Sequence, residues 1–236
     1  MDAKQSLTIG IVGGMSPEST VSYYQHIVRR HQSEFHNHSY PRIVIASVSF
    51  QRYIDWQHEG AWDQIAKELE SEFQSVAAAG ADFAVLATNT MHKVLPQTDS
   101  PIPVLNIIDV VARYSKAKGM KSVGLTGTRF TMSDGFYAEG LEARGLKVLL
   151  PNKSGQEMIH NIIYDELIFG KVNSSSAQKF DDAARDLLNR GADAVILGCT
   201  ELALLMPEVP AHSEYIDSTQ IHADAAWEVS IGRRLF

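Results

Sequence analysis

The chain of 236 residues is long enough to bury a sizeable core in one or two domains, and its 44% hydrophobic and 21% charged content is ordinary for a globular protein. A net charge of −7 argues against a nucleic-acid-binding protein, which needs a basic surface. No apolar run approaches the roughly 18 residues of a membrane-spanning helix, Met1–Leu7 is too polar for a signal peptide, and a single cysteine excludes an internal disulfide. We therefore expect a cytoplasmic protein with no nucleic-acid or membrane partner.

Short apolar, β-branched runs alternate along the chain with longer amphipathic stretches. In chain order, the runs predict strands over Leu7–Val12, Ile43–Val48, Phe83–Ala87, Val104–Ile107, Ser122–Thr126, Lys147–Leu150 and Ala194–Leu197. The amphipathic stretches predict helices over Thr20–Arg30, Ala61–Ala79, Asp134–Arg144, Glu157–Ile168 and Ala177–Asn189. Strands that alternate with helices are typical of parallel sheets with crossover helices, so the pattern predicts an α/β fold.

An internal repeat runs through the chain. Residues 80–90 resemble residues 191–201: each segment begins with Gly-Ala-Asp, continues as a buried strand and reaches a polar residue eight positions after the glycine. An earlier pair of segments, residues 10–14 and 124–128, occurs in the same order. The repeat predicts a duplicated α/β unit.

The polar residues that end the repeated strands are Thr88 and Cys199. Open α/β sheets bind ligands at the carboxyl ends of their strands. If the two halves face each other, Thr88 and Cys199 approach one ligand from opposite sides. The repeat therefore predicts a paired site.

Cys199 lies between Gly198 and Thr200 at a predicted strand-to-helix junction. A helix N-terminus lowers the pKa of a thiol and favours the nucleophilic and basic thiolate, so we expect a functional cysteine with a lowered pKa. The alternative is a small apolar side chain that packs under the first helical turn.

The matching junction of the first half carries Thr88, Asn89 and Thr90. These residues cap a helix beginning near Met91, bind a ligand carboxylate through free backbone N–H groups, or do both. His92 either orients an active-site group or lies on the surface.

Three further patterns in the sequence point less specifically to a function. The glycines of residues 10–15 follow a strand but lack the G-x-G-x-x-G spacing of a dinucleotide site, so a tight turn before a helix is expected. The early histidines lack zinc-binding spacing, so no metal is expected. Any of four basic residues is a candidate to bind a substrate carboxylate: Arg52, Lys93, Arg129 and Lys153.

Gly13-Gly14-Met15, residues 88–92 (Thr-Asn-Thr-Met-His) and residues 198–202 (Gly-Cys-Thr-Glu-Leu) together resemble the aspartate/glutamate racemase family. The resemblance extends nearly end to end and includes residues 60–63 and 162–167. It implies two pseudo-symmetric α/β domains with the active site at their interface, commonly in a homodimer, without pyridoxal phosphate or metal. We place the first domain at residues 1–108 plus 208–236, with a C-terminal helix that returns to it, and the second at 109–207.

Most members of the family carry a cysteine on both faces of the substrate, and this chain has Thr88 in place of the first. That departure resembles the L-aspartate/glutamate-specific, broad-specificity branch of enteric bacteria. The resemblance assigns Cys199 to the L-face and Thr88 to the D-face. It also implies that the substrate pocket is lined by Met15, Gln57, Asn89, Thr90, Thr200 and Glu201.

Two positions of this chain bear on its substrate. Glu201 stands where dedicated glutamate racemases usually have histidine, which favours the aspartate-type branch. Ile168 stands where some aspartate racemases place a lysine, which leaves the residue that binds the side-chain carboxylate open.

Racemisation removes a proton α to a carboxylate and returns one on the other face. A thiolate at Cys199 is a suitable base, and Thr88 can donate a proton directly or from water. The alternatives are a single-thiol decarboxylase, a maleate-type isomerase and a non-catalytic protein that binds acidic amino acids.

Overall fold

The structure, a computed structural model, describes residues 6–209 and 214–236. The chain divides into two compact units, the first formed by Met1–Ile107 with His222–Phe236 and the second by Ile108–Ile221. Each unit contains a four-stranded parallel sheet with flanking helices. The predicted α/β class with two parallel sheets is confirmed.

The first unit has its strands in the order β2-β1-β3-β4. All pairs are parallel, and Ile9 lies opposite both Ile43 and Phe83. The strands are β1 (Ile9–Gly13), β2 (Ile43–Ser47), β3 (Phe83–Leu86) and β4 (Val104–Leu105). The helices are α1 (Pro17–Phe35), α2 (Phe50–Glu59), α3 (Trp62–Ala78) and α9 (Ser218–Ser230), whose last nine residues belong to this unit.

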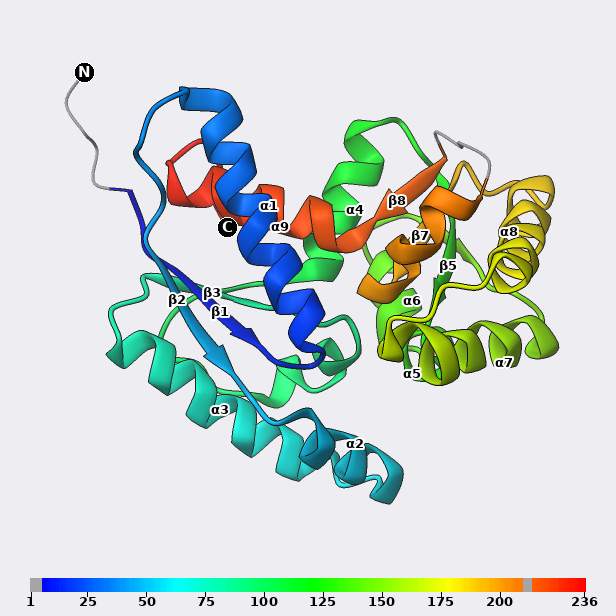
Figure 1. The fold of residues 1–236 in the computed structure, drawn as a ribbon, viewed down its shortest axis with the longest axis horizontal. Helices are drawn as coiled ribbons and strands as arrows, with labels where there is room; N and C mark the ends of the chain where they lie inside the picture. The colour runs from blue at the N-terminus through cyan, green and yellow to red at the C-terminus, as the bar shows by residue number, and fades with distance from the viewer. Residues whose placement is uncertain (1–5, 210–213) are drawn as a thin grey trace. The chain divides into compact units, whose positions relative to one another are not determined.

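Helices α1 and α3 cover opposite faces of the first sheet (Figure 1). Helix α1 begins where the side chain of Ser16 accepts a hydrogen bond from the backbone N–H of Ser19, with Pro17 in the first turn. Helix α3 places Leu69 and Phe73, both fully buried, in a core cluster beside the sheet. Burial on both faces explains why β1 reads as a continuous apolar run.

The second unit repeats this arrangement with the order β6-β5-β7-β8. All pairs are again parallel, and Gly127 lies opposite Gly198. The strands are β5 (Ser122–Gly127), β6 (Lys147–Leu149), β7 (Ala194–Gly198) and β8 (Tyr215–Asp217). The helices are α4 (Ile107–Ala117), α5 (Arg129–Ser133), α6 (Phe136–Glu142), α7 (Lys153–Asn161) and α8 (Ser174–Asn189).

The core of the second unit lies between α8 and the sheet. Phe180, Ala184 and Leu187 of α8 recur at helical spacing and are fully buried with Val195 of β7. Helix α7 continues into a π-helical turn over Ile162–Glu166, which carries two further core residues. This turn also brings Tyr164 to the edge of the same core.

The Gly-Ala-Asp repeats have the same structural role in both units. Gly80 and Gly191 have φ values of 93° and 98°, a conformation that glycine adopts without steric cost. The carboxylate of Asp82 then accepts a backbone N–H at the start of the first sheet, and that of Asp193 accepts two at the start of the second. These residues of the repeat hold strands together.

The second domain boundary differs from our prediction. We placed the return to the first domain at residue 208, but β8 pairs with β7, so the second unit continues to Ile221. Strand β8 has three residues, too few to show an alternating pattern, and it was not predicted. Residues 210–213, which precede it, lie outside the described residues.

Candidate active site

The two polar junctions follow equivalent strands of the two units. Thr88 comes two residues after β3, and Cys199 comes directly after β7. Both strands occupy the third position in the strand order of their sheets, and both are fully buried. The junctions therefore lie at the carboxyl edges of their sheets, where α/β folds bind ligands.

Five of the predicted site residues belong to the first unit. Met15 follows β1, Gln57 lies on α2, and Thr88, Asn89 and Thr90 follow β3. All five are buried, with 4–8% of their surface exposed. Four of the five are polar, and buried polar side chains are usually hydrogen-bonded.

A buried imidazole fixes the backbone at Thr88. The Nε2 atom of His92 accepts the backbone N–H of Ile107 at 3.1 Å, so the ring proton of the neutral imidazole lies on Nδ1. Nδ1 then donates to the carbonyl oxygen of Thr88 at 2.8 Å. Of the two roles left open for His92, the surface one is wrong, because the residue is only 2% exposed.

A second buried imidazole lies beside the first, with 6.0 Å between the ring centroids of His92 and His222. The Nε2 atom of His222 donates to the carbonyl of Leu105 at 2.9 Å, and its Nδ1 accepts the hydroxyl of Tyr23 at 2.7 Å. Burial, with a smaller contribution from His92, lowers the pKa of His222 to about 3. No sequence pattern pointed to His222, because the residues that it contacts are distant in the chain.

The thiol of Cys199 donates a hydrogen bond to a carboxylate oxygen of Glu201 at 2.9 Å. Cys199 has extended backbone (φ −148°, ψ 134°), and Thr200 begins a 3-10 helix that ends at Glu208. Glu201 is buried with 8% exposure, and Cys199 is partly buried. The chain thus places a thiol and a buried carboxylate in direct contact.

This contact overturns the expected pKa of the thiol. We expected a helix N-terminus to lower the pKa of Cys199, but burial and then the charge of Glu201 raise it well above its ordinary value. The backbone N–H groups of Thr200 and Glu201 act in the opposite direction and are outweighed. The resting residue is therefore a thiol that is hydrogen-bonded to a carboxylate.

Tyr164 belongs to residues 162–167, one of the segments that resemble the family, and the sequence predicted no role for it. Burial, followed by the charges of Cys199 and Glu201, raises the pKa of its hydroxyl to about 12, and Arg129 lowers it. Its ring lies 4.5 Å from that of His160 between centroids. The pKa of Tyr164 is therefore influenced both by Cys199 and Glu201 and by the cationic side chain of Arg129.

Thr200 takes part in the structure of the second junction. Its hydroxyl accepts a hydrogen bond from that of Thr219 at 3.3 Å, which connects the residue after Cys199 to the start of α9. Of these three consecutive residues, Cys199 and Glu201 are hydrogen-bonded to each other, and Thr200 is hydrogen-bonded to Thr219.

Side-chain and backbone atoms of the same unit pack closely against the two glycines at the end of β1, Gly13 and Gly14. A Cβ atom on Gly13 would collide with the side chain of Thr20, whose hydroxyl accepts the N–H of Gly14 at 2.7 Å. One on Gly14, where φ is 91°, would collide with the backbone of Val48. These contacts explain the glycines through close packing and agree with the expected tight turn before a helix.

The four basic candidates fall into two groups. Arg52 pairs with Glu68 at 2.9 Å, and the amine of Lys93 lies 3.7 Å from the ring centroid of Trp62. Arg129 and Lys153, by contrast, line one cavity in the second unit. The structure thus brings together two of the four.

No three of the histidine, cysteine, aspartate and glutamate side chains in residues 6–209 and 214–236 are grouped as metal ligands would be. Over the same residues, no helix has the length and hydropathy needed to cross a membrane.

Comparison with known proteins gives matches over almost the whole chain. The profile of the Asp/Glu/Hydantoin racemase family matches residues 12–226. A crystal structure of a candidate Asp/Glu racemase from Yersinia pestis is 34% identical, covers 95% of this chain and 99% of its own, and has a TM-score of 0.87.

Two further relatives are similar over most of their length. The crystal structure of an aspartate racemase homologue from Pyrococcus horikoshii OT3 is 33% identical, covers 94% of this chain and 98% of its own, and has a TM-score of 0.79. The broad specificity amino-acid racemase RacX of Bacillus subtilis (strain 168) is 23% identical over 89% of this chain and 92% of its own.

Proposed function

Because the chain belongs to the Asp/Glu/hydantoin racemase family, we propose that it interconverts the enantiomers of aspartate or glutamate without a cofactor, using Cys199 and Thr88 on opposite faces of the α-carbon. The observation that carries the proposal is the thiol–carboxylate pair of Cys199 and Glu201 at the carboxyl end of β7. Thr88 holds the equivalent place after β3. Aspartate and glutamate are the amino acids that the names of these relatives give most often.

The Cys199–Glu201 pair contains one shared proton, and its position decides the role of the thiol. With the proton on sulfur, Cys199 is ready to donate to a planar intermediate, as the D-to-L direction requires. With the proton moved to Glu201, Cys199 is a thiolate that can remove the α-proton of the L-enantiomer. Glu201 therefore acts on the thiol as a proton acceptor, a role more specific than lining the pocket.

Thr88 serves the other face as a proton donor. A threonine hydroxyl is too weakly acidic to be stored as an alkoxide, so it passes a proton to the carbanion and takes one from water. The imidazole of His92, which holds the carbonyl of Thr88, limits the movement of this residue. Asn89 and Thr90, which follow it, would bind the α-carboxylate, and Met15, Gln57 and Thr200 would line the pocket.

The test is a panel of L- and D-amino acids incubated with purified protein and analysed by chiral chromatography. Turnover of aspartate or glutamate that is lost in Cys199→Ala supports the proposal. Uptake of deuterium at the α-carbon without release of carbon dioxide separates racemisation from decarboxylation. Saturable binding of an acidic amino acid with no turnover would replace the proposal with a binding function. The homodimer and the cytoplasmic location expected from the sequence stay predictions.

A further inference from the structure

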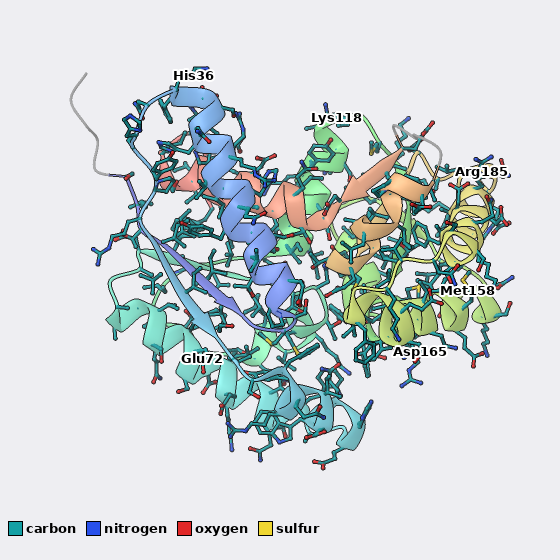
Figure 2. All side chains as sticks on the ribbon, viewed as in Figure 1. His36, Glu72, Lys118, Met158, Asp165 and Arg185 are labelled. Atoms are coloured by element: carbon teal, nitrogen blue, oxygen red, sulfur yellow. The ribbon has the colours of Figure 1, made fainter. Side chains whose placement is uncertain are left out.

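The cavity that contains Arg129 and Lys153 lies in the second unit and has a volume of about 330 Å³. That volume is at the lower end of the range for small-molecule sites. The cavity is formed by α5 and α7, and Figure 2 shows the side chains of this region, with Met158 marking α7 and Asp165 the turn that follows it. Its two cations come from different helices and converge on one space.

The positive charges of Arg129 and Lys153 are not balanced by ion pairs within the described part of the chain. Of the residues that the structure describes, no carboxylate forms an ion pair with Arg129 or with Lys153. The guanidinium of Arg129 lies 5.6 Å from the ring centroid of Phe130, and both cations are largely exposed. In this respect they differ from Arg52, which has Glu68 as a partner.

The other polar groups of the cavity set its charge and its donors. Glu157 is the single acidic residue of the lining, which leaves one positive charge in excess. His160 also lines the cavity, and its Nδ1 accepts the backbone N–H of Arg129 at 3.4 Å, so Nε2 carries the proton of the neutral ring. Gln156 and Asn161 add amide groups. The one excess positive charge favours an anion, and the guanidinium of Arg129 can offer two parallel N–H groups to a planar carboxylate.

The strand register relates this cavity to the thiol. Gly127 lies opposite Gly198, so the chain leaves β5 toward Arg129 beside the point where it leaves β7 at Cys199. Lys153 follows the neighbouring strand β6. All three side chains thus come after the carboxyl ends of adjacent parallel strands. Tyr164 lies within electrostatic reach of both Arg129 and Cys199.

We propose that the Arg129–Lys153 cavity binds a carboxylate group. The carboxylate is either the side chain of the amino acid that reacts at Cys199 or a separate small dicarboxylate. The first source rests on the proposed racemase function, whereas binding of a carboxylate as such does not. Arginine binds carboxylates through two parallel N–H bonds, and lysine adds a point charge.

The binding experiment uses succinate as the probe, titrated into the full chain and followed by NMR. We compare the wild type with Arg129→Gln, Lys153→Gln, Glu157→Gln and, as a control that removes one exposed lysine outside the cavity, Lys179→Gln. We expect Kd to rise about tenfold in the first two variants, to fall severalfold in Glu157→Gln and to stay unchanged in Lys179→Gln. Inorganic phosphate, titrated in parallel, should bind more weakly than succinate.

Kinetics then identify the source of the carboxylate. If it is the substrate side chain, Arg129→Gln and Lys153→Gln raise KM for acidic amino acids more than for neutral ones. If it is a separate ligand, succinate binding weakens and KM is unchanged. The proposal is overturned if all four variants bind succinate like the wild type with unchanged KM, or if phosphate binds more tightly. A wild type that racemises nothing but binds succinate through Arg129 would contradict only the proposed function.

Discussion

The junction after β3 and the junction after β7 occupy equivalent places in two sheets of the same strand order, yet their chemistry differs. In the first unit a buried imidazole, His92, holds the backbone carbonyl of Thr88. In the second unit a buried carboxylate, Glu201, contacts the side chain of Cys199 itself. The first arrangement positions a hydroxyl, and the second controls the proton of a thiol. A duplicated framework therefore carries two different proton-transfer groups, and the residues that differ between its copies carry the proposed chemistry.

The largest effect should come from removing the side chain at each junction. We expect Cys199→Ala to abolish racemisation from both enantiomers, because the only thiol of the chain is lost. Thr88→Ala should lose most racemisation and retain α-deuterium exchange on the L-substrate, since Cys199 still serves that face. Initial rates from both enantiomers with deuterium incorporation make the comparison. If Thr88→Ala racemises like the wild type, Thr88 is only a structural residue of its turn.

The matched variant Thr88→Cys places the same group at both junctions. Enantiomers have equal free energy, so kcat/KM must be the same in both directions, but kcat and KM can differ separately. A hydroxyl is a poorer base than a thiolate, so the wild type should have a lower kcat and a lower KM from the D-enantiomer. Thr88→Cys should bring the constants of the two directions closer together. Unchanged asymmetry would contradict the equivalence of the two junctions.

The next largest effect concerns the proton shared by Cys199 and Glu201. Moving it from sulfur to the carboxylate needs no exchange with solvent, so kcat/KM of the wild type should be flat through neutral pH. In Glu201→Gln the thiol must lose its proton to water, so kcat/KM should fall about 100-fold at neutral pH and rise as the pH is raised. The pH profiles of both proteins test this. A flat profile in Glu201→Gln would remove Glu201 from the proton path.

Features of the fold and of the candidate site that have a local cause in the sequence could be predicted, and features that depend on contacts between distant residues could not. The seven predicted strands are apolar, β-branched runs, and all seven exist with small shifts at their ends. Helix α9 was expected only as a C-terminal helix somewhere in residues 208–236. Its bounds were not predicted, because most of its residues are buried, which removes the alternation of faces that marks an amphipathic helix. Helices α2, α4 and α5 were missed. The repeat pointed to both junctions because each lies at a fixed distance from a Gly-Ala-Asp segment.

The electrostatics of the site depended on three-dimensional contacts that spacing does not reveal. The lowered pKa expected for Cys199 assumed a helix N-terminus, but the chain forms a 3-10 turn that folds Glu201 onto the thiol. His92 and His222 lie far apart in the sequence and become neighbours only through folding. The sequence could not distinguish Arg129 and Lys153, which line one cavity, from Arg52 and Lys93, which contact Glu68 and Trp62, because these contacts form only in the fold.

A smaller effect should separate two buried tyrosines, Tyr23 of α1 and Tyr137 of α6. The hydroxyl of Tyr23 donates to His222, whereas that of Tyr137 has no hydrogen-bond partner among the described residues. Tyr23→Phe should lower the free energy of unfolding by about 1–3 kcal/mol, because it leaves a buried imidazole nitrogen unpaired. Tyr137→Phe should be neutral or stabilising. Urea unfolding of both variants makes the test, and equal destabilisation would contradict the difference.

The smallest effect should come from the aspartates of the two Gly-Ala-Asp repeats. Asp82 accepts one backbone N–H, from Thr8, and Asp193 accepts two, from Lys121 and Ser122. The two N–H groups lower the pKa of Asp193, so the unfolded chain binds this proton more readily than the folded one. The resulting stability is present above the ordinary aspartate pKa and is lost as the pH falls through the lower pKa of the folded state.

We therefore expect Asp193→Asn to lower Tm at pH 7, by an amount equivalent to about 1 kcal/mol, and Asp82→Asn to lower it less, because one hydrogen bond is affected instead of two. Below the ordinary aspartate pKa, the difference between the wild type and Asp193→Asn should shrink, because the native carboxylate is then being protonated as well. Thermal unfolding of the three proteins at pH 7 and near pH 3 measures both trends. A deficit in Asp193→Asn that is the same at both pH values would mean that the shape of the side chain, and not its charge, stabilises the start of the second sheet.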